Sequence, residues 1–290
     1  MILPSFLIVF SISAYVIINT LKESLGYIPE LFLNDFTFRY YTELFGNKTF
    51  MKSIIYSFYV AFVSTALSTV IGTYLGYMVS KSKGLLYNII YKFPILLSYI
   101  AAAALIFSTY SDKGLLYHIG LILNLDINNI NIIYNTNGFA VILLNVFKGI
   151  PFIAFSVSPI FVKNDHKFKE TAKNLGCSDI IYIFRVLLPM SKRAIITSSL
   201  VIFNFNLFTY EGFYFLGPST PISLGVLVYQ TYINPDITNR ANGMAINMIM
   251  IVFSLIMCLI YYNVIKNNKT DESEIDNDNE LEDFEYENNK

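Results

Sequence analysis

Apolar runs separated by short polar segments dominate the chain. Six of the runs come close to the ~20 residues that a helix needs to cross the hydrocarbon core of a bilayer. A signal peptide is the alternative for the first run, but no basic segment precedes it and no small-residue cleavage site follows it. The pattern therefore predicts an all-α integral membrane protein with six transmembrane helices. The predicted spans are Ile2–Leu21, Ile54–Ser80, Ile89–Tyr110, Phe139–Val162, Ala194–Leu216 and Met244–Ile265.

The second span carries a small residue at every fourth position. Side chains of this size let a neighbouring helix approach closely. We therefore expect this face to pack against another helix rather than to bind a ligand. Its members are Ser64, Ser68, Gly72, Gly76 and Ser80.

Prolines and glycines interrupt two other apolar regions. Pro94 lies near the start of the third span and is expected to bend it. Gly217, Pro218 and Pro221 follow the fifth span and break the chain. The stretch 224–232 is apolar on one face but too short to cross a bilayer, which indicates an interfacial or re-entrant helix.

A charged segment, residues 163–193, lies between the fourth and fifth spans. Phe168, Ala172 and Leu175 are spaced as i, i+4 and i+7, which predicts a short helix with one apolar stripe. Gly176 is expected to end that helix, as a glycine at the C′ position does.

A second short helix is expected after this glycine. Asp179 is placed to cap it, and Pro189 to prevent it from continuing into the fifth span. The segment is therefore predicted to form a helix, a turn and a helix outside the bilayer. The apolar positions of the second helix are Ile180, Ile183, Phe184 and Leu187.

The composition supports the membrane class. Hydrophobic residues make up 54% of the 290 residues and charged residues only 14%, against about 25% charged in soluble proteins. Residues 1–266 carry 18 Lys and Arg against 11 Asp and Glu, whereas residues 267–290 carry 2 against 10. We expect residues 1–266 to form the transmembrane domain and the acidic tail, residues 267–290, to be disordered.

The basic residues predict the orientation. The segments on the same side as residues 163–193, including the tail, hold 13 Lys and Arg, and the opposite side holds 6. The positive-inside rule then places residues 163–193 and both termini in the cytoplasm, and membrane topology explains the basic residues better than a nucleic-acid partner does. Lys148 is counted on neither side of the membrane, because it lies within the fourth span. We expect it to snorkel to the interface or to precede the span in a short helix, with a substrate contact as the alternative.

The fifth span is the least lipid-like of the six. Several polar side chains interrupt it, so this helix should face protein or a cavity. Glu211 is the only acid within any span, and an ionisable group at membrane depth is a candidate functional residue. The alternative for Glu211 is a position near the outer interface, bonded to a neighbouring helix. The residues expected to line a polar path are Asn204, Asn206, Tyr210, Glu211 and Tyr214.

Residues for catalysis or metal binding do not cluster along the sequence. Cys177, Cys258, His118 and His166 are isolated and show no metal-ligand spacing. No Gly-rich loop ending in Gly-Lys-Ser/Thr occurs, so binding of ATP in the P-loop manner is not expected. We expect no enzyme activity and no cofactor in this chain.

A spaced motif lies in residues 163–193. It resembles the EAA loop that marks the permease subunits of bacterial ABC importers: Glu-Ala-Ala, three residues, Gly, nine residues, Ile, any residue, Leu, Pro. Thr171 replaces the second alanine and Val186 the isoleucine. An ordinary amphipathic linker is the alternative. The matching positions are Glu170, Thr171, Ala172, Gly176, Val186, Leu188 and Pro189.

The resemblance covers about residues 50–265 and implies ATP-driven import. In that family the EAA loop is the coupling helix that docks on a cytoplasmic ATPase. The resemblance therefore implies that Glu170, Thr171, Ala172, Gly176, Leu188 and Pro189 couple this chain to an ATP-binding subunit dimer, which would bind the ATP. It also implies a second permease subunit, an extracytoplasmic substrate-binding protein and a place in the bacterial plasma membrane.

The cargo is less clearly indicated. Residues 216–236 resemble the outer loop of permeases of the spermidine and putrescine subgroup, which also serves iron, thiamine and phosphonate importers. A polyamine would suit Glu211, Tyr210 and Tyr214 on the translocation path through charge attraction and cation–π contact. Iron, thiamine, phosphonate and sugar are the alternative cargoes. A secondary transporter that needs no ATPase is the alternative class, but it predicts inverted repeats or more intramembrane ionisable groups, and the sequence shows neither.

Overall fold

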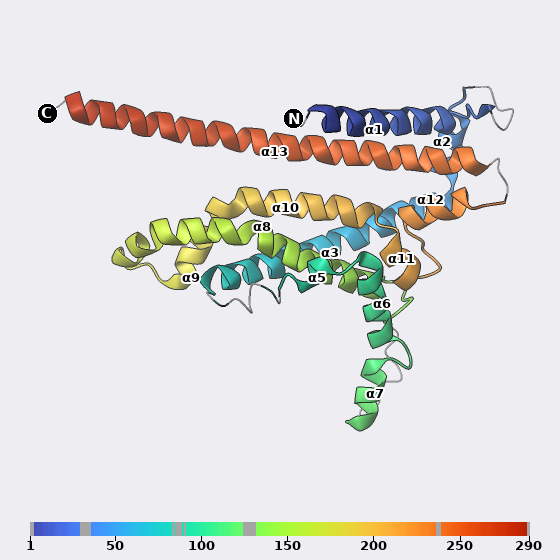
Figure 1. Cartoon of the computed structure of the whole chain (residues 1–290), viewed down its shortest axis with the longest axis horizontal. Coiled ribbons are helices and arrows are strands. Elements are labelled where there is room, and N and C mark those ends of the chain that lie inside the picture. The colour runs from blue at the N-terminus through green and yellow to red at the C-terminus, as the bar shows by residue number, and fades with distance from the viewer. Residues whose placement is uncertain are drawn as a thin grey trace.

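The computed structural model describes residues 3–29, 36–82, 84, 89, 91–123, 132–235 and 239–288. The regular elements of this part of the chain are helices, as the apolar pattern predicts. Five long helices lie roughly side by side and form the body of the molecule (Figure 1). They are α1 (Leu3–Ser24), α3 (Lys48–Lys81), α8 (Phe139–Asn174), α10 (Leu188–Phe208) and α13 (Arg240–Asn288).

Short helices lie at the two ends of the body (Figure 1). The end with α9 (Asp179–Tyr182) and the π-helix η2 (Ile183–Leu187) is called the α9 end below. The other end, called the α12 end, carries α2 (Arg39–Gly46), α11 (Glu211–Leu216) and α12 (Leu224–Tyr232). Helix α12 is the short helix that the sequence predicts after the fifth span.

The closest packing in the body joins α3 to α8. Ser64, Ser68, Gly72 and Gly76 are buried and Ser80 is half-buried, so the predicted packing face is confirmed. A Cβ atom on Gly72 would lie 2.8 Å from the carbonyl oxygen of Ile150 in α8. The absence of a side chain at Gly72 therefore sets how closely the two backbones approach.

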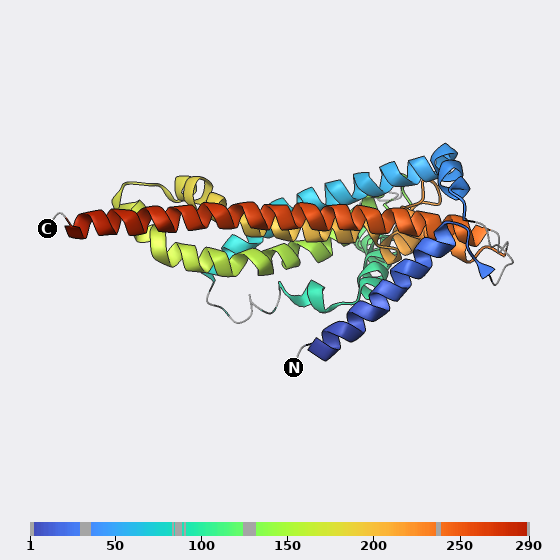
Figure 2. The same cartoon turned by 90° about the horizontal axis from the view of Figure 1, so that it is seen from above.

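An ion pair at the α12 end joins α1 to α13. Arg240 Nε donates to Glu23 Oε2 at 3.0 Å, and Arg240 Nη2 donates to Glu23 Oε1 at 3.1 Å. Glu23 is buried and also accepts a hydrogen bond from Asn19. Because a buried carboxylate is costly without a partner, this pair holds the end of α1 on α13. The start of α1 diverges from α13, as the second view shows (Figure 2).

The third span is not the single helix that its apolar run predicts. Five helices of the described residues are long and apolar enough to cross a membrane, and none of them lies in this run. Helix α5 (Phe93–Leu96) ends before Leu97, which is extended, and α6 (Tyr99–Tyr110) begins after Ser98. The Ser98 hydroxyl caps α6 by accepting a hydrogen bond from the Ala101 N–H at 3.1 Å. The break therefore falls at Leu97 and Ser98.

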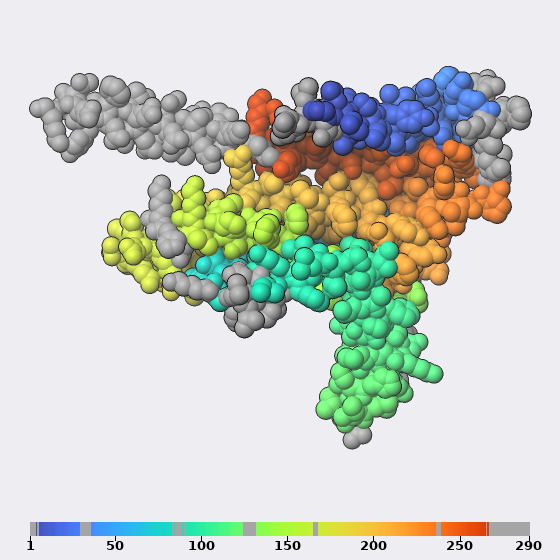
Figure 3. Space-filling view, viewed as in Figure 1, coloured from blue at the N-terminus to red at the C-terminus, as the bar shows by residue number. Residues whose placement is uncertain are grey.

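Pro94 does not bend the third span in the predicted way. It lies in the first turn of α5, where a proline replaces an N–H that would have no helical partner. Beyond the break, α6 and α7 (Leu115–Ile122) leave the body at a steep angle (Figure 1). They form an arm that stands out from the body in the space-filling view (Figure 3).

Two other predicted span boundaries are shifted. Helix α8 runs without interruption from Phe139 to Asn174, so the fourth span and the first helix of residues 163–193 are one helix. No glycine or proline lies between Pro159 and Gly176 to stop it earlier. Helix α10 ends at Phe208, where the extended Thr209 separates it from α11. Glu211 therefore begins a separate helix rather than lying within the fifth span.

Helix α13 is 49 residues long and extends past the predicted end of the sixth span. Its helical backbone continues to Asn288, through the segment for which the acidic composition predicts disorder. No glycine or proline follows Gly243, so the sequence contains no strong helix breaker in this region.

Candidate functional site

The turn after α8 is a hydrogen-bonded helix stop at Gly176, which confirms the predicted stop. Gly176 has a φ of +75°, in the left-handed region. Its N–H donates to the Lys173 carbonyl, and the Cys177 N–H donates to the Ala172 carbonyl, both at 2.9 Å. This pair of bonds is the Schellman arrangement. Since nothing lies within 4 Å of a Cβ built on Gly176, it is the backbone conformation and not the space that favours glycine here.

The cap of the following helix is not the predicted one. The Ser178 hydroxyl accepts a hydrogen bond from the Ile181 N–H at 3.5 Å and is the cap of α9. Asp179 occupies the first turn instead, where its negative charge favours the helix N-terminus. The prediction was wrong by one residue because both side chains are good caps.

Pro189 does not end the helix, contrary to the prediction. The backbone stays helical from Asp179 to Phe208 through the π-helix η2. In that turn the Leu188 N–H bonds to the Ile183 carbonyl, five residues earlier. A proline lacks an N–H and crowds the carbonyl four residues before it, and a π-turn widens the backbone at that point.

The α9 end carries an uncovered apolar surface, called the apolar tip below. It consists of Leu175, Ile180 and Phe184, whose side chains are 83%, 70% and 67% exposed. The predicted stripe is therefore divided: Phe168 and Ala172 pack on the cluster around Tyr182 and Leu187, whereas Leu175 faces outwards. Large exposed apolar side chains that lie together indicate an interaction surface.

The other motif residues lie around this tip. Glu170 and Thr171 are exposed at the end of α8, and Ala172 is half-buried behind them. Leu188 is half-buried and Pro189 is exposed at the start of α10. The fold thus brings both halves of the spaced motif to the α9 end.

The two asparagines of α10 face different neighbours. Asn206 is 2% exposed, and its Nδ2 donates to Ser64 Oγ at 3.1 Å and to Thr65 Oγ1 at 3.3 Å, both in α3. Asn204 instead accepts a hydrogen bond from Ser254 of α13 at 3.1 Å. The structure therefore places only Asn206 between α3 and α10.

Tyr210 and Tyr214 form a cluster with Tyr229 of α12 at the α12 end. The Tyr210 ring centroid lies 5.1 Å from that of Tyr214 and 4.7 Å from that of Tyr229. Glu211, the first residue of α11, is half-buried beside them and accepts a hydrogen bond from Thr209 at 3.5 Å. Aromatic faces beside a carboxylate can bind an alkylammonium group. Tyr229 is not among the residues predicted to line a path, and it joins the cluster only through the packing of α12.

Lys148 and Asn145 of α8 are further functional candidates, of which the sequence had indicated Lys148 but not Asn145. Lys148 lies within α8 and does not reach for the interface as predicted: its ammonium donates to the carbonyls of Pro94 at 2.8 Å and Leu97 at 2.5 Å. Asn145 is 1% exposed and accepts a hydrogen bond from the Tyr99 hydroxyl. Their i, i+3 spacing inside an apolar run was the available signal.

A cavity of about 260 Å³ lies where α8 and α10 face each other. Asn145, Lys148 and Asn206 line it together with apolar side chains. The Nδ2 of Asn145 is buried and has no hydrogen-bond partner in the described residues. No acidic residue lines the cavity, and the Asn145 amide is the donor in its wall that has no protein acceptor among the described residues.

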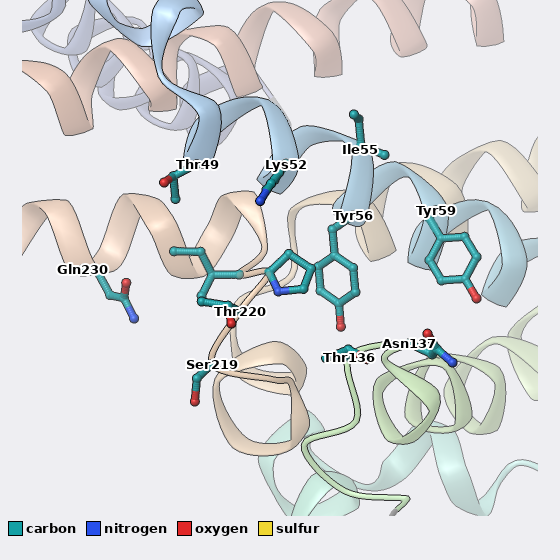
Figure 4. A pocket seen from close by; sticks show the side chains of 12 residues that line it. Thr49, Lys52, Ile55, Tyr56, Tyr59, Thr136, Asn137, Ser219, Thr220 and Gln230 are labelled. Carbon is teal, nitrogen blue, oxygen red and sulfur yellow. The ribbon is translucent and has the colours of Figure 1, made fainter.

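A larger pocket of about 790 Å³, called the α12-end pocket below, opens at the α12 end (Figure 4). Lys52 and Tyr56 of α3 form one wall, and Ser219, Thr220 and Gln230 line the opposite side. None of the lining residues is acidic. Among the described residues, no group of three or more His, Cys, Asp or Glu is placed to hold a metal ion.

Comparison with known families identifies a match over most of the chain. The family described as "Binding-protein-dependent transport system inner membrane component" matches residues 68–269. A spermidine/putrescine transport system permease, PotC of Haemophilus influenzae, is 21% identical over 80% of this chain and 83% of its own length. A polygalacturonan/rhamnogalacturonan transport system permease, YtcP of Bacillus subtilis, is 27% identical over 83% of this chain and 80% of its own length.

Solved structures show the same fold. A chain of a bacterial alginate ABC transporter, in complex with an alginate-pentasaccharide-bound periplasmic protein, superposes with a TM-score of 0.75 at 16% identity. The match covers 90% of this chain and 91% of that chain. A chain of the inward-facing MetNI methionine ABC transporter gives a TM-score of 0.54 at 15% identity, covering 74% of this chain and 94% of that chain.

Proposed function

Because the chain belongs to the family of binding-protein-dependent transport system inner membrane components, we propose that it is a permease subunit whose apolar tip docks on a separate ATPase. The family match and the long apolar helices make it a multi-pass membrane protein. The observation that supports docking is the tip itself, in which Leu175, Ile180 and Phe184 lie uncovered at the α9 end. ATP would be bound by the ATPase and not by this chain.

The proposed orientation follows from this docking. The α9 end faces the cytoplasm, with both termini on the same side of the plasma membrane. The α12 end then faces outwards, so the α12-end pocket, whose lining contains no acidic residue, lies on the side of an extracytoplasmic binding protein. A second permease subunit completes the translocation path, and closure of the ATPase dimer drives the change between outward and inward access.

Co-purification tests the proposed partnership. The tagged chain, extracted in mild detergent, should bring down an ATP-binding subunit and a second permease subunit, identified by mass spectrometry. Docking removes the apolar tip from water, which contributes more free energy than a surface ion pair does. A well-folded chain that retains no ATPase with or without nucleotide would overturn the proposal.

We propose a polyamine as the cargo, on the basis of the tyrosine cluster and Glu211. The ring centroids of Tyr210, Tyr214 and Tyr229 lie within 6 Å of one another, beside the half-buried carboxylate of Glu211. Ring faces and a carboxylate both attract an alkylammonium group. The similarity to the spermidine/putrescine permease supports this cargo.

Replacing the carboxylate tests this cargo. Glu211→Gln should lower uptake of labelled spermidine at sub-saturating concentration about tenfold, as expected for loss of one charge-assisted contact. Asp112→Asn, which removes an exposed acid between α6 and α7, should leave uptake unchanged. Equal spermidine uptake by the wild type and Glu211→Gln would show that Glu211 does not bind the cargo on the translocation path.

A hydroxylated or acidic sugar is the second candidate cargo. The cavity between α8 and α10 supports it, because the unpartnered Nδ2 of Asn145 and the absence of lining acids suit a ligand rich in acceptor oxygens. The similarity to the polygalacturonan/rhamnogalacturonan permease supports this class equally. Uptake of a labelled uronate oligosaccharide that persists in excess spermidine would favour it over a polyamine.

A further inference from the structure

One turn of α8 holds both sides of the break in the third apolar run. On the near side, Lys148 Nζ donates to the carbonyls of Pro94 at 2.8 Å and Leu97 at 2.5 Å, with that of Ile95 at 3.5 Å. On the far side, Asn145 Oδ1 accepts a hydrogen bond from the hydroxyl of Tyr99, the first residue of α6. The two holding residues lie three positions apart, on one face of α8.

These contacts satisfy backbone carbonyls that the break in the helix leaves without helical partners. The carbonyls at the end of α5 have no helical partner because Leu97 is extended. Where such groups lie at membrane depth, water is not available to satisfy them, so non-helical backbone is tolerated only where protein groups do so. The Lys148 ammonium supplies charge-assisted donors to two of these carbonyls. It therefore stabilises the break and does not merely accompany it.

The start of α6 is fixed on further helices through Tyr99. Its ring makes an edge contact with Phe205 of α10, with ring centroids 5.5 Å apart. A Cβ on Gly212 of α11 would lie 3.0 Å from the Tyr99 ring, so α11 closes over the ring. Asn145 thus holds the first residue of α6 through its hydroxyl, and beyond it Ala102, Ala103 and Ile106 bury the next turns of α6 in the core of the body.

Helix α8 connects Lys148 and Asn145, which hold the two sides of the break, to the apolar tip. It is one helix from Phe139 to Asn174, so Lys148 lies about 40 Å along the axis from the turn at Gly176, at 1.5 Å per residue. Pro151 and Pro159 lie inside α8 between Lys148 and the tip, and the backbone stays helical through both. A displacement of the tip would therefore reach Lys148 and Asn145 without crossing a loop.

We infer that Lys148 and Asn145 are positioning residues that tie the α5–α6 break, and with it the α6–α7 arm, to the movement of α8. The hold on the break stands on the contacts of this chain alone. The link to transport rests on the proposed function, in which an ATPase moves the tip.

A distance between two spin labels tests the hold. Cysteines at the exposed positions Leu115 in α7 and Tyr74 in α3, with Cys177 and Cys258 replaced by serine, report the arm against the body in lipid nanodiscs. Lys148→Met keeps a long side chain but removes the donors. It should raise the fraction of molecules outside the wild-type distance peak about tenfold. Lys148→Arg should restore the peak, and Lys163→Met, which removes an exposed lysine of the same helix, should not change it.

Two further experiments separate a failure of the Lys148 and Asn145 contacts from a failure of the proposed function. Asn145→Leu releases the α6 side only and should broaden the same distance distribution, so it replaces Lys148→Met if that variant does not fold. If both variants gave the wild-type distance distribution, the inference that Lys148 and Asn145 hold the break would be overturned. With co-purified ATPase, nucleotide should shift the distance in the wild type and not in Lys148→Met, while basal ATP hydrolysis continues. No nucleotide shift in the wild type would instead count against the proposed coupling and leave the hold standing.

Discussion

Gly176→Val should weaken binding of the ATPase about tenfold and abolish most ATP-driven uptake. The φ of +75° at Gly176 is strained for any residue with a Cβ, and most of all for a β-branched one. The left-handed region costs about 1–2 kcal/mol for an L-residue, which corresponds to roughly a tenfold change in an equilibrium. We expect the variant to relieve this strain by opening the turn, which would displace Leu175 relative to Ile180 and Phe184 of the apolar tip.

The matched variant at this position is Gly176→Asn. Asparagine tolerates the left-handed region, and a Cβ at Gly176 meets no atom within 4 Å, so ATPase binding should stay close to that of the wild type. The amount of ATPase retained on the tagged chain measures both variants, and the thermal midpoint in detergent checks that each is folded. Equal retention by Gly176→Val and the wild type would mean that the turn conformation does not matter for docking.

Gly72→Leu should prevent stable folding of the body. A Cβ at this position would lie 2.8 Å from the Ile150 carbonyl oxygen and 2.9 Å from Ile153 Cβ. Backbone cannot move aside as a flexible side chain can, so the backbones of α3 and α8 must move apart at this point. Overpacking of this kind costs about 1–3 kcal/mol and more where the backbone must shift. We expect a large loss of monodisperse protein and a lowered thermal midpoint in detergent.

Gly46→Leu is the control for the steric effect of Gly72→Leu. Gly46 ends α2, and a Cβ there meets nothing within 4 Å. The same substitution should change stability by no more than about 0.5 kcal/mol, as exposed sites usually do. A Gly72→Leu protein that unfolds at the wild-type temperature would show that α3 and α8 do not meet at this point.

The features that the sequence predicted well depend on properties local to a few residues. The length of an apolar run predicts a spanning helix, and this was right for α1, α3 and the helix that begins at Phe139. A small residue at every fourth position of α3 predicts a close neighbour, and Gly72 has one. A lone glycine after an amphipathic stretch predicts a helix stop, and Gly176 is one.

The features that the sequence did not predict depend on contacts between distant segments. The break between α5 and α6 is supported by Lys148, which lies 51 to 54 residues from the carbonyls it bonds. A hydropathy pattern shows an unbroken apolar run there, because it contains no information on which carbonyls have partners. The turn around Pro189 likewise needed the wider π-helical path, which a rule based on a single proline does not anticipate.

Helical class, the packing face of α3 and the stop at Gly176 follow from the order of residues, because helix propensity, side-chain size and backbone strain act within one or two turns. The roles of the polar residues were decided by the tertiary structure. Asn204 and Asn206 are two positions apart in α10, yet one bonds to α13 and the other to α3. Periodicity indicates that two such residues point in different directions, but only the packing of the helices determines which neighbour each side chain meets.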